Sequence, residues 1–144
     1  MIRHLAKHMR PSDIKEIIAA GSDNPYNTLK RSVASSKSAV VACYEDEPLV
    51  IFGMNEPNPS TGTAVIWMLG TNQSLKFRRE FMYYTRMVLD EMLLDAYQLT
   101  NYVHVGNTQS VRWLKALGFA LDAPITAGPY GEKFRRFTME RKDV

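Results

Sequence analysis

The sequence has few of the cysteines and histidines that stabilise many small proteins through disulfides or bound metal ions. Among its 144 residues there is one cysteine, Cys43, which excludes an intrachain disulfide and a cysteine-rich zinc site. Three histidines without a His-Glu-x-x-His spacing also argue against a bound metal. We therefore expect a protein without a metal site, stabilised by its hydrophobic core in a reducing compartment.

Long hydrophobic runs are also missing. The longest apolar runs, near residues 39–43, 49–52 and 64–69, fall far below the roughly 20 residues of a membrane-spanning helix. Residues 1–7 are charged and lack the apolar centre of a signal peptide. These absences predict a cytoplasmic protein without a membrane partner.

Charge of one sign is only weakly in excess. Lysine and arginine total 18 against 15 for aspartate and glutamate, a net charge of +3, which is too small an excess to predict nucleic-acid binding. The hydrophobic share of 45% and the charged share of 23% are typical of a globular domain. Because no repeat or linker interrupts the chain, we expect one domain over residues 1–144.

The order of the expected elements predicts the fold class. Apolar, β-branched runs indicate strands, and capping residues with apolar spacings of three and four indicate helices. Strands are expected over residues 1–6, 38–44, 48–54, 63–69, 99–105, 119–125 and 133–140, and helices over 14–20, 26–35, 74–97 and 107–117. Hairpins followed by a strand–helix–strand unit are typical of an α+β domain with a mixed sheet.

The segment from Val103 to Phe119 is the most specific stretch. It predicts a strand end, a helix capped by Asn107 and a stop at Gly118. By itself such a segment indicates only a well-formed corner between a strand, a helix and the next strand. Asn107, Ser110, Gly118 and Phe119 stand at the offsets found in the GNAT superfamily of acyl-CoA-dependent N-acyltransferases, which the chain resembles. More narrowly, residues 76–79 and 101–119 are similar to the GNAT-like internal virion protein family of short-tailed bacteriophages.

This resemblance implies a GNAT-like single domain with a mixed, mostly antiparallel sheet of about seven strands and about four helices. The sheet would splay between its fourth and fifth strands, and the pantetheine arm of acetyl-CoA would lie in the gap. The pyrophosphate would bind the loop and helix start after the fourth strand, where backbone N–H groups and the helix dipole favour an anion. The candidate cofactor-binding residues are then Met68, Leu69, Gly70, Thr71, Asn72, Gln73, Ser74, Lys76, Arg78, Arg79, Asn107, Ser110 and Trp113.

Charge placement on the long expected helix bears on the same site. Lys76, Arg78 and Arg79 lie near its N-terminal end, where each exposed cation costs very roughly 0.3–1 kcal/mol against the helix dipole. A bound phosphate would relieve that repulsion. Alternatively, the three side chains extend into solvent, or Lys76 pairs with Glu80 one turn away.

Several residues depart from the GNAT pattern. Lys76 and Arg78 stand where the family normally has small residues in its phosphate loop. Leu114 stands where many members have a tyrosine that acts as a general acid. The expected strand over residues 63–69 carries no carboxylate to act as a base. Substitute catalytic candidates are His104, whose imidazole suits a base near neutral pH, and Glu56 and Tyr130 in loops. Each has a plain alternative, as a hydrogen-bonded strand histidine, a solubilising loop carboxylate and a loop aromatic.

Two functions follow. The first is phage-encoded, acetyl-CoA-dependent transfer of acetyl to an amine of a protein or small molecule, with a backbone N–H near Leu69 supporting the oxyanion. The second is a catalytically inactive GNAT-fold phage protein that acts in virion assembly or binds a host protein. Either would exist as a monomer or homodimer, in the infected host cytoplasm or in the virion, and fold alone does not decide between them.

Overall fold

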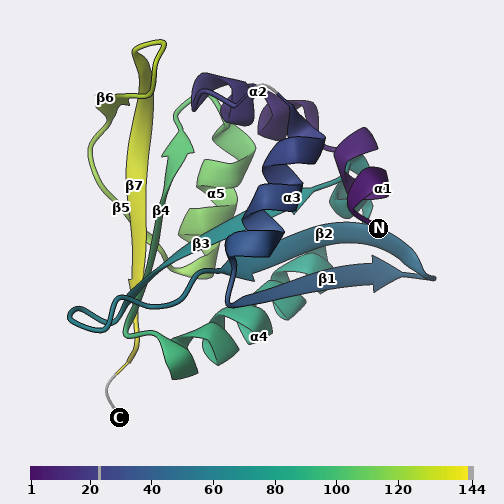
Figure 1. Cartoon of the computed structure of the whole chain (residues 1–144). Coiled ribbons are helices and arrows are strands. Elements are labelled where there is room, and N and C mark those ends of the chain that lie inside the picture. The colour runs from purple at the N-terminus through teal and green to yellow at the C-terminus, as the bar shows by residue number, and fades with distance from the viewer. Residues whose placement is uncertain (23, 143–144) are drawn as a thin grey trace.

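The protein is described here by a computed structural model, which covers residues 1–22 and 24–142 (Figure 1). Its helices are α1 (Ile2–Lys7), α2 (Pro11–Ala19), α3 (Pro25–Ser35), the 3-10 helix η1 (Asn72–Phe77), α4 (Arg78–Asp95) and α5 (Thr108–Leu117). Its strands are β1 (Ser38–Tyr44), β2 (Glu47–Met54), β3 (Thr63–Gly70), β4 (Gln98–His104), β5 (Ala120–Leu121), β6 (Ile125–Ala127) and β7 (Glu132–Glu140). Within the described residues, no helix is long and apolar enough to cross a bilayer.

The strands form one mixed sheet in the order β1-β2-β3-β4-β7-β5, with β6 also paired to β7. All pairings are antiparallel except the one between β3 and β4. That parallel pairing joins only Thr63–Val65 to Gln98–Thr100, and the strands then separate toward their C-terminal ends. The space between residues 66–70 and residues 101–104 is called the gap below. It confirms the splay that the family resemblance implies.

Helices cover both faces of the sheet, as Figure 1 shows. Alternate side chains of β2 separate the two layers, because successive strand residues point to opposite faces. Phe52 and Met54 join the larger core with α4 and α5, whereas Ile51 packs with Leu5 of α1 and Leu29 of α3. The core therefore lies on both sides of the sheet, one part under each helical layer.

The N-terminal segment differs from the sequence-based expectation. Residues 1–6 were expected to form a strand, but Ile2–Lys7 is a helix. Ile2 and Leu5 lie one helical turn apart and pack together against the core of α3 and β2, with Leu5 only 2% exposed. Because tertiary contacts determine so short an element, local pattern could not distinguish the two states.

Two other expected elements are divided. The expected helix over residues 74–97 is η1 followed by α4, and the buried Ser74 hydroxyl donates to the Thr71 carbonyl within the tighter turn. The expected strand over residues 119–125 is two short strands, β5 and β6, separated at Pro124, which has no N–H to donate. A seven-strand total is thus reached with β6 in place of the missing first strand.

The caps of α5 are confirmed. Asn107 Oδ1 accepts a hydrogen bond from the Ser110 N–H at 3.3 Å, as an N-cap residue does. Gly118 ends the helix in the left-handed region with φ of 101°. These two residues fix where α5 begins relative to the end of β4.

Candidate functional site

The gap contains a cavity of about 460 Å³ that runs between the two helical layers. This volume lies within the usual range of small-molecule sites, about 300–1,000 Å³. The side chains around it are mostly apolar, and they include Ile66, Trp67, Met68, Leu69, Val103, Trp113, Leu114, Phe119 and Phe134. Polar lining residues come from several elements, and the two carboxylates among them, Asp13 and Glu16, both belong to α2. The strand separation therefore creates an apolar pocket with two carboxylates at one side.

Helix α2 lies across the opening of the gap, above the end of β4 in Figure 1. Asp13 Oδ2 accepts a hydrogen bond from the Gly70 N–H at the end of β3, at 3.0 Å. Glu16 Oε1 accepts from the His104 N–H at the end of β4, at 2.7 Å. Asp13 and Glu16 are three residues apart and so lie on one face of the helix. Each carboxylate thus accepts a hydrogen bond from one of the two strands, at an N–H group that the splay leaves without a strand partner.

Arg10, the residue before α2, is buried at the same place with only 2% of its surface exposed. Its guanidinium donates to Asp13 at 2.7 and 3.0 Å and to the Ser110 hydroxyl at 3.2 Å, and it lies 4.6 Å from the centre of the Trp113 ring. Its own N–H donates to the Gly70 carbonyl at 2.9 Å. Arg10 therefore connects the end of β3 to the first turns of α5 across the opening.

Glu16 is the side chain whose ionisation this arrangement changes. Burial raises the pKa of its carboxyl above the ordinary value, because a charged carboxylate loses hydration there. Hydrogen bonds from the His104 N–H and from Asn107 Nδ2, the latter at 2.8 Å, lower the same pKa in part. The nearby Asp13 carboxylate raises it further. Burial is the larger effect, so the pKa of Glu16 stays above its usual range.

The loop after β3 was expected to offer backbone N–H groups to a phosphate. Four of these donors are used within the protein: Gly70 by Asp13, Thr71 by the Leu49 carbonyl, Asn72 by the His8 carbonyl and Ser74 by the Thr71 carbonyl. Lys76, Arg78 and Arg79 are exposed, and within the described residues none of the three forms an ion pair. The loop is thus a packed 3-10 turn with cations on its outer side.

The expected cofactor-binding residues divide into two groups. Met68, Leu69, Ser110 and Trp113 line the cavity. The others extend from Gly70, the last residue of β3, through η1 to Arg79 in the first turn of α4. Asn107 is the exception, and its amide is engaged with Glu16 and with the Ser110 N–H.

The three catalytic candidates do not lie together. His104 has both ring nitrogens engaged, with Nε2 at 3.2 Å from Glu132 and Nδ1 accepting from the Gly106 N–H at 3.0 Å. Glu56 is in the loop between β2 and β3, at the closed end of the β3–β4 pairing, and its Oε1 is 3.8 Å from Lys37 Nζ. Tyr130 is 68% exposed in the turn before β7. None of the three lines the cavity.

Arg10, Asp13 and Glu16 were missed by the sequence analysis. Their spacing of three places them with Ile17 on one side of α2, so this helix has charged residues on its buried face. The available signal was the presence of charged residues at the spacing of a core-facing stripe. Charged residues are rarely buried unless they are paired, so this spacing indicates buried partners for them.

Comparison with known proteins identifies the family. A sequence model of the family described as bacteriophage T7, probable scaffold protein Gp13, matches residues 40–126. The chain belongs to this family. No curated protein sequence matches it.

Solved structures with the same fold are GNAT acetyltransferases. A probable GNAT-family acetyltransferase from Chromobacterium violaceum has a TM-score of 0.69 at 17% identity, covering 96% of this chain and 79% of that one. The ribosomal L7/L12 N-acetyltransferase RimL, in complex with coenzyme A, has a TM-score of 0.69 at 10% identity, covering 96% and 85%. A dodecameric spermidine N-acetyltransferase from Vibrio cholerae has a TM-score of 0.62 at 12% identity, covering 78% and 71%. At these identities the likeness shows the GNAT fold, as the resemblance implied.

The residues of this family member can be compared with what coenzyme A requires. The apolar cavity has room for a pantetheine arm. The two amides of that arm need hydrogen-bonding partners along the strands, yet the Gly70 and His104 N–H groups donate to α2. Arg10 also closes the path between the end of β3 and α5, by which an arm from the loop after β3 would enter. A coenzyme A bound along the full length of the gap would therefore have to displace α2 and Arg10 from its end.

Proposed function

We propose that this protein is a non-catalytic GNAT-fold component of bacteriophage particle assembly. The observation that carries the proposal is the position of α2, whose Asp13 and Glu16 take the strand donors at the opening of the gap. A protein that bound acetyl-CoA there would need these donors free. Membership of a family described by a probable scaffold protein supports the assembly role.

The chemistry of the remaining residues agrees with this proposal. Leu114 lines the cavity at the position where many GNAT enzymes have a tyrosine that acts as a general acid, and a leucine cannot transfer a proton. Strand β3, with the sequence TAVIWMLG, contributes no carboxylate. His104, the imidazole nearest the gap in sequence, is held by Glu132 and Gly106. Leu114, β3 and His104 thus supply neither a general acid nor a free base to the cavity.

The first test is thermal unfolding with and without acetyl-CoA. A ligand at 100 times its Kd stabilises a protein by roughly 2.7 kcal/mol, so binding in the micromolar range gives a large shift at millimolar ligand. We expect no shift for this protein, whereas RimL, whose solved structure contains coenzyme A, serves as the positive control. A saturable increase in Tm would overturn the non-catalytic assignment.

The second test addresses the assembly role directly. Deletion of the gene from the phage that encodes it is expected to lower the yield of infectious particles and to change their protein composition. A plasmid copy of the wild-type gene should restore both. Particles of unchanged yield and composition would refute a role in assembly.

Acetyl transfer to an amine is the second candidate, and one observation favours it. The cavity holds a carboxyl group, Glu16, with a pKa raised by burial, and such groups are often catalytic. This function requires α2 to leave the opening so that a thioester could enter. It predicts that Arg10→Ala or Asp13→Ala strengthens acetyl-CoA binding, and the same titration with these variants decides between the two candidates.

A further inference from the structure

Strand β1 is an open edge of the sheet. It pairs with β2 on one side, and within residues 1–22 and 24–142 no strand pairs with its other side. Its seven residues, SAVVACY, include neither a charge nor a proline. Natural proteins usually protect such edges with lysines, prolines or short strands, since unpaired backbone groups recruit another strand.

The opposite edge of the same sheet is protected in this way. There β7 is flanked by β5, with two residues, and by β6, with three, and Pro124 lies between them. Arg135 also donates to the carbonyls of Leu121 and Asp122 at that edge. The same fold thus protects one edge of its sheet and leaves the other edge, β1, open.

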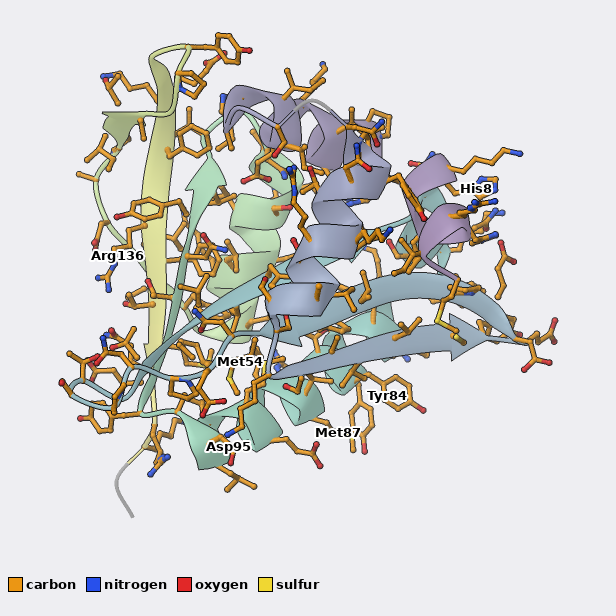
Figure 2. All side chains as sticks on the ribbon, in the orientation of Figure 1. His8, Met54, Tyr84, Met87, Asp95 and Arg136 are labelled. Atoms are coloured by element: carbon orange, nitrogen blue, oxygen red, sulfur yellow. The ribbon has the colours of Figure 1, made fainter. Side chains whose placement is uncertain are left out.

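The surface beside β1 is apolar. Val40 is 44% exposed and Tyr44 is 49% exposed, and both belong to the strand itself. Tyr84 and Met87 of α4 are half exposed, and Figure 2 shows them projecting beyond the sheet on the side where β1 lies. An uncovered backbone edge is thus accompanied by apolar side chains that another chain could bury.

The charges at the two ends of β1 are of opposite sign. Lys37 precedes the strand, and the turn that follows it contains Glu45, Asp46 and the first residue of β2, Glu47. In an antiparallel pair of two β1 strands centred on Val41, residue 37 of one copy lies opposite residue 45 of the other. Lys37 would then lie near the turn residue Glu45 of the partner subunit at both ends of the pair, while the uncharged centres meet each other.

We infer that two copies of this protein associate through β1, as antiparallel strands related by a two-fold axis. Such an interface is self-complementary, since each copy supplies the same strand and the same pair of charges. Backbone hydrogen bonds along the edge provide the attachment, as in other strand-addition complexes. Lys37 Nζ lies 3.8 Å from Glu56 and 3.9 Å from Asp95, two long and solvent-exposed ion pairs that it would exchange for Glu45 of the partner subunit. The inference holds whether or not the protein transfers acetyl groups.

The experiment is charge reversal followed by sedimentation equilibrium of the full chain. At about 100 µM, where a micromolar Kd gives nearly complete association, we expect the wild type to be a dimer. Lys37→Glu places two carboxylates opposite each other, and Glu45→Lys places two ammonium groups opposite each other. Each variant alone should raise the dimer Kd by about tenfold or more.

An equimolar mixture of the two variants provides the decisive measurement. Each contact then joins a glutamate to a lysine, so a mixed dimer should form although neither variant dimerises alone. The control is Asp122→Lys, a charge reversal on the opposite edge, which should leave the dimer unchanged. Circular dichroism establishes that each variant is folded, and Val40→Lys, which places a charge at the centre of the strand, offers a second way to prevent pairing.

Three results would overturn the inference. One is a monomeric wild type at about 100 µM, including the case in which a different phage protein binds to β1. Another is a dimer that both single reversals and Val40→Lys leave intact, which would place the interface elsewhere. The third is a mixture that stays monomeric when both variants are folded, which would exclude the antiparallel register.

Discussion

Replacing Arg10 tests the energetic role of the buried cation at the gap. In the wild type its guanidinium makes two hydrogen bonds to Asp13 and further bonds to Ser110 and to Gln109, the last at 3.3 Å. In Arg10→Met the side chain still fills much of the space beside Trp113 but donates nothing. The Asp13 carboxylate, itself only 3% exposed, would keep the Gly70 N–H as a partner and lose the opposing charge.

Removing one member of a buried ion pair costs about 3–5 kcal/mol, because the other charge is left without compensation. We expect a loss near the lower end of this range, since Asp13 retains one donor. For a domain of this size each kcal/mol lowers Tm by roughly 2–4 °C, so a decrease of about 10 °C is expected. Urea unfolding followed by far-UV circular dichroism gives the free energy, and tryptophan fluorescence reports on the surroundings of Trp113.

The double variant Arg10→Met/Asp13→Leu separates the charge effect from packing. With both charges removed, the main loss is the unpaired Gly70 N–H, about 1–3 kcal/mol, so the double variant should be more stable than Arg10→Met. Lys15→Met, on the exposed side of the same helix, is the matched control and should change stability by less than about 0.5 kcal/mol. The reasoning is refuted if Arg10→Met stays within about 1 kcal/mol of the wild type, or if Asp13→Leu worsens it further.

Three other predictions concern Glu16 and the two ends of α5. Asn107→Ala should lower the free energy of unfolding in urea by at least about 2 kcal/mol, since it removes the cap of α5 and a hydrogen bond to Glu16. Asn107→Asp keeps the cap but repels Glu16. Full stability of Asn107→Asp would contradict the hydrogen bond between Asn107 and Glu16. Gly118→Ala should cost about 1–2 kcal/mol because φ is 101° there, and an unchanged unfolding midpoint would refute the strain. For Glu16→Gln, a raised folded-state pKa means that wild-type stability is full below the ordinary pKa and is lost as pH rises through the raised one. The variant should therefore gain on the wild type as pH rises above the ordinary carboxyl pKa, and a difference in unfolding free energy that is constant with pH would contradict the raised pKa.

The features that the sequence predicted well depend on neighbours close along the chain. Asn107 and Gly118 act on residues three and four positions away, so their roles are visible in a window of one or two turns. The hairpin of β1 and β2 is predicted for the same reason, since its turn lies between two apolar runs. The prediction of a strand over residues 1–6 is wrong because packing against α3 and β2 determines the secondary structure there, and no local window contains those elements.

The site was less predictable, because its hydrogen bonds join distant parts of the chain. The bond from the Gly70 N–H to Asp13 spans 57 residues, and that from the His104 N–H to Glu16 spans 88. The resemblance located the gap and part of its lining, namely Met68, Leu69, Ser110 and Trp113. It could not show that α2 fills the opening, since charges on a short helix are normally solvated and only the folded chain provides buried donors for them.

The position of α2 has an energetic reason that bears on function. A sheet that separates without a ligand leaves backbone N–H groups unpaired, and each one costs about 1–3 kcal/mol when buried. A cofactor-binding protein keeps such donors free and accepts lower stability in the unliganded state. Here Asp13 and Glu16 satisfy them permanently, at the cost of burying two carboxylates, of which one is compensated by Arg10 and the other has a raised pKa. A fold that makes this exchange is stable without a ligand, which suits a structural component whose binding surface lies elsewhere, such as the open edge of β1.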